Sequence, residues 1–535
     1  MKFELESGKM TEIEIPVLVL GGSLVGLSAG IFLANSGVPN IIVEKHLGSM
    51  PHPRAMGYTA HTMEFFRCVG LADKIPQVKS DTRIRRAKVT SLFGEWQGET
   101  SWGGKPDVPK PDTPKPANPS PCNGAAIPQD KLEPILRERA LELGCKILQH
   151  TLFLGLQQNE SGIVAIVRDR SNNHTYKILA QYMIAADGAK SAVREALQIP
   201  RKGRGYIQTL TSVLFRCPQA DEVLSKGVVQ FEIDQPNLKA FMTTYSDGRW
   251  ALMFRDNVER TQEQLLEAAK QAVGHENAHI DLITTAKWDL SALVCEYYSK
   301  GRVFLAGDSA HALPPTRGGY GANTGIDDVH NLAWKLKLVL EQKASKSLLD
   351  TYSIERQPIG WLRHQQTFAR PDYAAQSQGI AANERIIDDA GMELGQLHTS
   401  KAICGADVVD IAAQKPDLWK GQPGVRAPHS WVSKRGEVLS TIDLFNKNFV
   451  VLSENEEWLE ATQHVAQQLD IEIDFVLAGK DIVFAKASDF QEIFGIDRYG
   501  ASLVRPDGIV GWRSKRKATR PSKALIEAFN QILHL

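Results

Sequence analysis

Gly21, Ser23 and Gly26 are the first residues whose types and spacing could do chemistry. They follow an apolar run at residues 17–20 in the G-x-G-x-x-G layout of a dinucleotide-binding turn, with serine in the middle position. The glycines allow a tight turn and a close approach of helix to strand, and the N–H groups that begin the next helix attract a pyrophosphate. Glu44, after the next apolar run, can accept hydrogen bonds from an adenosine ribose and would repel a 2′-phosphate. This stretch therefore predicts a site for FAD or NAD rather than for NADP.

Asp187 and Gly188 end a second apolar run, at residues 182–186. An Asp-Gly pair after a strand is most often only a turn. At the carboxyl end of a parallel strand, however, it would lie where open α/β sheets bind their ligands. Arg54 lies in a loop after Glu44 and likewise has two interpretations. Its side chain is either solvated or in contact with a phosphate.

A third motif begins with an apolar run at residues 303–306 that ends at Gly307 and Asp308. A loop rich in proline and glycine follows, and a long helix with one apolar face is predicted from Asn323, which we interpret as its N-cap. Such a helix aims its positive end at a flat ligand and would stabilise the negative charge of a reduced isoalloxazine. The Asp308 carboxylate could then hold a ribityl hydroxyl.

The elements that must position these motifs belong to an α/β fold. Residues 17–44 predict a strand, a helix and a second strand, which is the start of a Rossmann-like sheet. The pattern changes at residues 209–288 to short strands, which predict an antiparallel sheet with a helix at residues 262–273. This block indicates an α+β domain inserted into the first domain.

Aromatic residues in the inserted block are candidates for a substrate pocket. Tyr245, Trp250 and Phe254, together with Phe241 and Met242, could line such a pocket. Alternating aromatic residues on a sheet are more often part of the core. Both interpretations stay open on the sequence alone.

Chain length, charge and cysteine content narrow the class of protein. A chain of 535 residues should hold two or three domains, and its 62 basic and 62 acidic residues cancel, so no nucleic-acid partner is expected. The N-terminal segment lacks the apolar core of a signal peptide, and prolines and glycines interrupt the uncharged stretch at residues 15–43, so we expect a cytoplasmic protein without a membrane span. Six scattered cysteines without a C-x-x-C pair indicate reduced thiols and no metal site.

Seven prolines within residues 106–121 predict a surface loop or a stiff flap beside a pocket.

Three ordered motifs carry a family resemblance: GGSLVG with Glu44, AADG at residues 185–188, and GDSAHALPP followed by NTG at residues 323–325. With them the chain resembles the class A flavoprotein monooxygenases, the single-component aromatic hydroxylases that include para-hydroxybenzoate hydroxylase and the phenol and polyketide hydroxylases. The similarity implies FAD as cofactor, NADPH or NADH as a transient co-substrate, and O₂. It implies catalytic roles for Pro315, near the oxygen-reactive face of the flavin, and for Arg54, near the pyrophosphate and the nicotinamide. The cofactor contacts that it implies are Gly21, Ser23, Leu24, Val25, Gly26, Glu44, Lys45, Arg54, Gln129, Asp187, Gly188, Gly307, Asp308, Pro315, Gly321, Ala322, Asn323 and Thr324.

The last third of the chain is similar to the thioredoxin-like domain that phenol and polyketide hydroxylases append. It contains no cysteine, so thiol exchange is excluded and a packing or dimerisation role is expected. We expect an FAD-binding domain at residues 12–80, 122–200 and 290–375, a substrate-binding domain at residues 81–121 and 201–289, linking helices at residues 376–420 and a thioredoxin-like domain at residues 421–535.

The function implied is hydroxylation of a phenolic or polycyclic, polyketide-like ring by a monomer or homodimer. A nicotinamide cofactor would reduce FAD, O₂ would add to form a C4a-hydroperoxide, and one oxygen atom would pass to the ring. Baeyer–Villiger or epoxide-forming oxygenation and a non-catalytic flavin-binding module are the alternatives. The base that deprotonates the phenol is left open between four residues that are candidates by location: Tyr206, Tyr245, His311 and Tyr320.

Overall fold

The apolar run before Gly21 forms β1 (Glu12–Leu20), an inner strand of a mainly parallel sheet. β1 pairs in parallel with β2 (Asn40–Val43) and β10 (Thr175–Ala185), and β10 pairs in parallel with β17 (Val303–Leu305). The computed structural model describes residues 11–79, 84–100, 118–254, 256, 258–315, 319–381, 384–407, 409–486 and 488–535.

The register of these strands brings the three motifs to one edge of the sheet. Leu20 lies opposite both Val43 and Ala185, and Ala185 lies opposite Leu305. All four strands run in the same direction, so the residues that follow them leave the sheet side by side. This edge is where an α/β sheet binds its ligand. The sheet is completed by β7 (Lys146–Leu148), β8 (Thr151–Gln158), β9 (Ile163–Asp169) and β16 (Ser299–Lys300).

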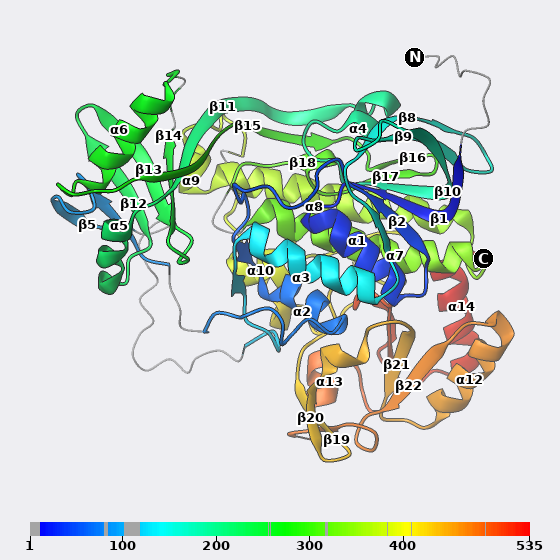
Figure 1. The fold of residues 1–535 in the computed structure, drawn as a ribbon. Coiled ribbons are helices and arrows are strands. Elements are labelled where there is room, and N and C mark those ends of the chain that lie inside the picture. The colour runs from blue at the N-terminus through cyan, green and yellow to red at the C-terminus, as the bar shows by residue number, and fades with distance from the viewer. Residues whose placement is uncertain are drawn as a thin grey trace.

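Helices cover the parallel sheet. α1 (Leu24–Asn35) is apolar on nearly every side because it contacts both α3 (Gln129–Glu142) and α7 (Tyr320–Leu340). α7 in turn contacts α8 (Asp350–Ala369), and both are long helices at the centre of the molecule (Figure 1). Shorter helices in this part are α2 (Ala60–Cys68), α4 (Ala192–Leu197), α9 (Pro371–Ala374), α10 (Asp389–Leu394) and α11 (Pro416–Trp419).

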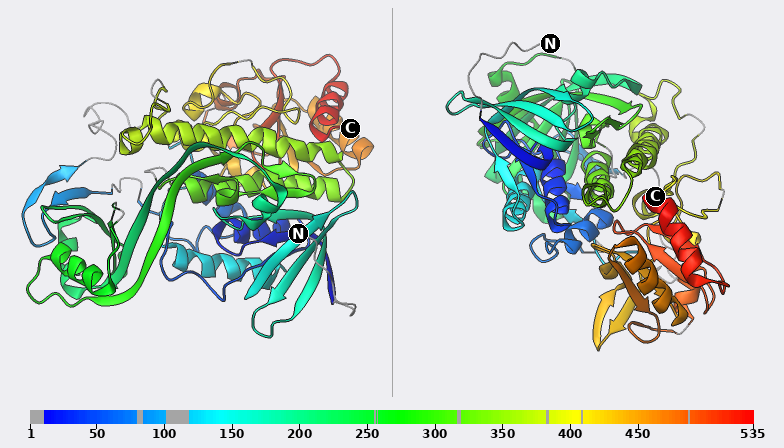
Figure 2. Two further views of the ribbon diagram at one scale, coloured as in Figure 1. Left: turned by 90° about the horizontal axis from the view of Figure 1, so that it is seen from above. Right: turned by 90° about the vertical axis from the view of Figure 1, so that its right-hand side faces the viewer.

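A second, eight-stranded sheet lies to one side of the first. Two long strands, β11 (Arg201–Arg216) and β15 (Asp281–Cys295), run from this sheet into the body that contains the parallel sheet (Figures 1 and 2). α6 (Gln262–Val273) packs on one face, which confirms the helix predicted there. The sheet order is β18-β15-β11-β14-β13-β12-β4-β5, with β4 (Arg86–Val89), β5 (Trp96–Thr100), β12 (Gln230–Gln235), β13 (Leu238–Thr244), β14 (Arg249–Phe254) and β18 (His311–Ala312).

The C-terminal part forms a smaller α/β unit below the parallel sheet in Figure 1. Its sheet has the order β22-β21-β24-β25, with a parallel pair β21/β22 and antiparallel pairs around β24. This part is thus an α/β unit, and the predicted α/β fold class is confirmed. The elements are β21 (Phe449–Ser453), α12 (Glu457–Leu469), β22 (Ile473–Leu477), β24 (Ala501–Val504), β25 (Val510–Ser514) and α14 (Pro521–Leu533), with α13 (Asp489–Phe494) and the three-stranded sheet of β19 (Trp431–Lys434), β20 (Glu437–Ser440) and β23 (Val483–Phe484) beside them.

Most of the proline-rich stretch lies outside the described residues. Of residues 106–121, only 118–121 belong to the described part of the chain. Both interpretations of this stretch, a surface loop and a stiff flap, therefore stay predictions.

Candidate flavin site

The turn after β1 has no room for side chains at its two glycines. Gly21 has φ +103°, and a Cβ built on it would lie 2.3 Å from the Ala186 carbonyl oxygen at the end of β10. A Cβ on Gly26 would lie 1.8 Å from the Gly21 carbonyl oxygen. Ser23 in the middle position has φ −91° and ψ −168°, an ordinary extended conformation that does not require glycine. The serine is therefore compatible with the turn.

Gln129, the first residue of α3, joins this turn to the loop that carries Arg54. Its Nε2 donates to Ser23 Oγ (2.9 Å) and its Oε1 accepts from the backbone N–H groups of Ala55 (3.3 Å) and Arg54 (3.4 Å). Ser23 Oγ in turn donates to Glu133 Oε1 (2.6 Å). The structure thus brings the three predicted contacts Ser23, Arg54 and Gln129 together.

Replacing Gln129 with alanine should weaken FAD binding by about 3- to 10-fold, because the loop and the turn lose their shared amide. Fluorescence titration of the apoprotein with FAD measures this. Gln158→Ala is a matched control, since that amide also bridges two backbone groups, Arg302 N–H and the Lys300 carbonyl, but at the start of β17 rather than at its carboxyl end. Equal losses in both variants would contradict the expected role of Gln129.

Glu44 lies directly beside the turn. Its Oε2 accepts from the Gly22 N–H (2.6 Å) and its Oε1 from the His46 N–H (2.8 Å), so the carboxylate is held at the end of β2. The neighbouring Lys45 is exposed, and its carbonyl accepts from the Arg170 guanidinium (3.1 Å). Both residues are at the strand edge that the sequence predicted.

Asp187 keeps one carboxylate oxygen free at the end of β10. Its Oδ2 accepts from the Val193 N–H (3.2 Å), while its Oδ1 is buried without a partner among the described residues. Burial raises the pKa of this carboxyl above its ordinary value. Gly188 beside it has φ +85° and open space around its α-carbon. An acceptor with free capacity at this edge fits a ligand better than a simple turn.

Two glycines of the third motif lie close against Val25 of the first motif. Gly307 has φ +62°, and a Cβ on it would lie 3.0 Å from Val25 Cγ2 of α1. A Cβ on Gly325 of α7 would lie 2.6 Å from the same atom and 2.7 Å from the Gly307 α-carbon. Segments almost three hundred residues apart in the chain therefore close on each other, as the shared site requires.

Asp308 follows at the turn η2 (Gly307–Ser309). A Cβ on Gly321 in the first turn of α7 would lie 3.7 Å from its Oδ1. Asp308 itself is exposed at this edge of the sheet. Among the described residues Asp308 has no hydrogen-bond or ion-pair partner, so its carboxylate is available to a ligand.

The prediction that Asn323 caps α7 is wrong. The helix begins at Tyr320 after Gly319, which has φ +56°. Asn323 lies in the first turn and holds another loop: its Oδ1 accepts from the Thr59 N–H (3.0 Å) and from Thr62 Oγ1 (2.6 Å). The amide is therefore used within the protein, and the positive end of the helix begins one turn earlier than expected.

Three other predicted contacts lie around the start of this helix. Ala322 is partly buried, and the buried Oγ1 of Thr324 has no partner in the described part of the chain. The carbonyl of Pro315 accepts from the Tyr373 hydroxyl (3.1 Å). Leu24, in contrast, has its side chain in the core, so it could meet a ligand only through its backbone.

Of the three predicted substrate contacts, only Tyr245 faces the parallel-sheet body. Its hydroxyl donates to the Pro53 carbonyl (3.1 Å) next to Arg54, and its ring packs with Leu214, Ala251 and Met56. Trp250 and Phe254 lie on the other face of β14, fully buried in the core under α6. The structure contradicts a substrate contact for these two, because the alternation of the strand points them away from the strand-end motifs.

His52 and Ser212 form a contact that the sequence did not indicate. The buried His52 Nε2 lies 2.6 Å from Ser212 Oγ, which joins the Arg54 loop to the face of β11 opposite the α6 core. Burial lowers the pKa of His52. A histidine two residues before a loop arginine carried no distinctive spacing, so nothing in the sequence marked it.

The four candidates for the substrate base occupy different environments. His311 and Tyr320 are buried, and Tyr206 is exposed with its hydroxyl 2.9 Å from Thr209 Oγ1. Burial raises the pKa of Tyr245, so that its hydroxyl stays protonated.

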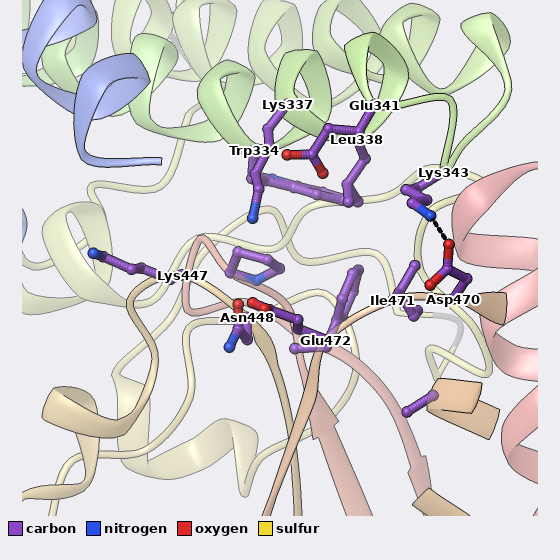
Figure 3. A pocket seen from close by; sticks show the side chains of 13 residues that line it. Trp334, Lys337, Leu338, Glu341, Lys343, Lys447, Asn448, Asp470, Ile471 and Glu472 are labelled. Carbon is purple, nitrogen blue, oxygen red and sulfur yellow. Dashed lines mark hydrogen bonds and ion pairs between the residues drawn. The ribbon is translucent and has the colours of Figure 1, made fainter. Parts of the chain in front are cut away.

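A cavity of about 370 Å³ lies elsewhere, between α7 and the C-terminal unit. Figure 3 shows Trp334 and Leu338 on its helix side, with Lys447 and Glu472 opposite and the Lys343–Asp470 ion pair at one end. None of the predicted site residues lines it, and it is not at the strand ends. This cavity is therefore distinct from the candidate flavin site.

The residues at the strand ends fit FAD. Among the described residues no side chain caps α1 or α7, so the N–H groups of their first turns are available to a ligand. The unpartnered Asp187 Oδ1 and the free Asp308 carboxylate add acceptors for hydroxyl groups. In the described part of the chain, no three His, Cys, Asp or Glu residues are grouped so as to hold a metal ion, and no helix is long and apolar enough to cross a membrane.

Two uncapped helix starts at the carboxyl ends of parallel strands are typical of a nucleotide-binding flavoprotein. Comparison with known proteins gives its family. A model described as FAD binding domain matches residues 14–367, and one described as Aromatic-ring hydroxylase, C-terminal, matches residues 420–534. The chain is 31% identical over 549 residues to 4-methyl-5-nitrocatechol 5-monooxygenase of Burkholderia sp, and 34% identical over 569 residues to tetracenomycin A2 monooxygenase-dioxygenase of Streptomyces glaucescens, with 98% of this chain and of each relative covered. The crystal structure of aklavinone-11 hydroxylase with FAD and aklavinone matches with a TM-score of 0.85 at 30% identity, over 98% of this chain and 100% of that chain.

The chain therefore belongs to the FAD-dependent aromatic-ring hydroxylases. This confirms the resemblance drawn from the three motifs. The protein is an FAD-dependent monooxygenase that uses NADPH or NADH and O₂ to hydroxylate an aromatic substrate.

Proposed function

We propose that the substrate is a phenol within a fused, polyketide-like ring system. The tetracenomycin and aklavinone enzymes are named for such polycyclic compounds, while the Burkholderia relative is named for a single-ring catechol. The observation that carries the proposal is the match of relatives named for polycyclic compounds, which are 30–34% identical over 98% of this chain. The substrate ring would lie near the buried cluster of Leu214, Ala251 and Tyr245, which adjoins Met56 and the Arg54 loop.

The residue roles follow from the same geometry. The first N–H groups of α1 would bind the pyrophosphate, Glu44 the adenosine ribose and Asp308 a ribityl hydroxyl. The positive end of α7 would stabilise negative charge on the reduced ring system, and Arg54 would receive the nicotinamide cofactor. Bound FAD supplies the electron transfer and the activation of oxygen. Pro315 would shape the oxygen-reactive side, where the protein must exclude water.

The remaining expectations also belong to the proposal. The FAD-binding part comprises residues 12–80, 122–200 and 290–375, the substrate-binding part residues 81–121 and 201–289, and the linking segment residues 376–420. The protein acts in the cytoplasm as a monomer or homodimer.

A panel of one-ring, two-ring and four-ring phenols tests the substrate class. NADPH or NADH oxidation by the FAD-loaded protein should rise most with a four-ring phenol, because relatives named for polycyclic compounds match this chain over 98% of its length. The product should gain one oxygen atom from ¹⁸O₂ as a new hydroxyl group. Stimulation by one-ring phenols alone would overturn the fused-ring assignment, and a lactone or epoxide product would overturn hydroxylation.

A further inference from the structure

Asp328 on α7 is a carboxylate buried completely inside the FAD-binding part. Its Oδ2 accepts from the Gly307 N–H (3.2 Å) and from His311 Nε2 (2.7 Å), and its Oδ1 accepts from Arg356 Nε (2.9 Å). A buried charge is tolerated only where such donors surround it. One side chain thus holds three groups from two separate segments of the chain.

Two of these donors lie at the two ends of one short turn. Gly307 directly precedes Asp308, and His311 begins β18 on the far side of the turn. The carbonyl of Leu305, just before the turn, accepts from the Tyr352 hydroxyl of α8 (2.6 Å). The conformation of the turn therefore depends on groups of α7 and α8 that lie behind it.

Arg356 provides the balancing charge from α8. Besides Asp328 it binds Asp327 Oδ2 (2.7 Å), and its Nη2 donates to the Thr324 carbonyl (3.4 Å). Burial opposes the charge of Arg356, but Asp327 and Asp328 outweigh it and raise the pKa of the guanidinium. The two adjacent aspartates therefore share one cation, while only Asp328 also reaches the turn.

We propose that Asp328 is a positioning residue for FAD, which fixes the Gly307–Ser309 turn so that the Asp308 carboxylate meets the ribityl chain. The inference rests on the proposed role of Asp308. An asparagine at position 328 has nearly the same shape, but its NH₂ group must replace one of the two acceptor oxygens. Toward Arg356 that group would meet a cation, so it should face the neutral Gly307 N–H and the His311 ring instead. The Gly307 N–H or the His311 ring would then lose its partner, and the turn would relax away from its position.

The test compares Asp328→Asn with Asp327→Asn in the full-length protein. Both variants remove a carboxylate from Arg356, so both should lower the melting temperature of the apoprotein. Only Asp328→Asn should weaken FAD binding, by about tenfold or more, because a hydrogen bond to a charged acceptor is lost at the turn. At saturating FAD, only Asp328→Asn should also shift the visible absorption bands of the flavin, which a general loss of stability would not do.

The inference is overturned if the two variants bind FAD equally well, or if Asp328→Asn leaves both the affinity and the spectrum as in the wild type. Asp308→Ala separates this result from a failure of the proposed site. If Asp308→Ala loses FAD while Asp328→Asn does not, the ribityl contact stands and the positioning role falls. If Asp308→Ala keeps FAD, the proposed site is wrong, and the role inferred for Asp328 falls with it.

Discussion

Asp308→Ala should lose most of its bound FAD and with it the oxygenase activity. Asp308 has no partner among the described residues, yet it lies at the end of β17 beside the first turn of α7. A charge-assisted hydrogen bond to a ligand hydroxyl would be worth a factor of about 10 to 100 in affinity. Because the carboxylate bonds to none of the described residues, its removal should leave the melting temperature of the apoprotein unchanged.

Flavin content after gel filtration, and titration of the apoprotein with FAD, measure this effect. Asp308→Asn keeps one acceptor oxygen and should have an intermediate affinity. Asp73→Ala removes an exposed aspartate that likewise has no partner in the described part of the chain, and it should bind FAD as the wild type does. Wild-type flavin content in Asp308→Ala would show that the ribityl contact is elsewhere.

Local sequence patterns were sufficient for the elements around the turn after β1. Glycine is required at positions 21 and 26, because an added Cβ would lie 2.3 Å from the Ala186 carbonyl oxygen and 1.8 Å from the Gly21 carbonyl oxygen, respectively. The helix at residues 262–273 was likewise predicted correctly, because its apolar positions recur with a helical period. Such features are decided within one or two elements, and a single sequence records them.

Asn323 and the aromatic residues of β14 show what local patterns leave out. Asparagine is a common N-cap, but here its amide binds Thr59 and Thr62 across the molecule, and Gly319 starts the helix instead. Alternation along β14 separates Ala251 from Trp250 and Phe254, but it does not say which face meets α6. That choice depends on how the sheet packs, which no single strand contains.

The buried charges are the features least visible in the sequence. Glu355 and Arg356 are adjacent on α8 and bind partners of opposite charge. Arg356 binds the aspartates of α7, and Glu355 binds the Lys335 ammonium group. Neither has a recognisable spacing, since their partners come from α7 and from a hairpin about 150 residues later. Charged residues are expected at the surface by default, so only the assembled fold identifies a pair like this.

Arg505→Met should destabilise the protein by about 3–5 kcal/mol, the usual cost of leaving a buried charge without its partner. Arg505 lies in the hairpin between β24 and β25 and donates twice to Glu355 of α8, at 2.9 Å each. It also binds Asp507, while Glu355 binds Lys335 (3.1 Å), and the side chains of Arg505, Glu355 and Lys335 have no exposed surface. The four charges cancel in pairs, so removal of one cation leaves two carboxylates with a single lysine.

The comparison that isolates this cause is the double variant Arg505→Met, Asp507→Leu. It restores the charge balance with only the Lys335–Glu355 pair remaining, so it should be more stable than Arg505→Met alone although it changes one more residue. Lys480→Met breaks an exposed pair with Glu456 in the same unit and should cost less than about 1 kcal/mol. Urea unfolding in excess FAD, followed by circular dichroism, measures all three. If the double variant is less stable than Arg505→Met, the loss comes from packing of the hairpin against α8, and charge balance does not explain how the C-terminal unit is held to the flavin-binding part.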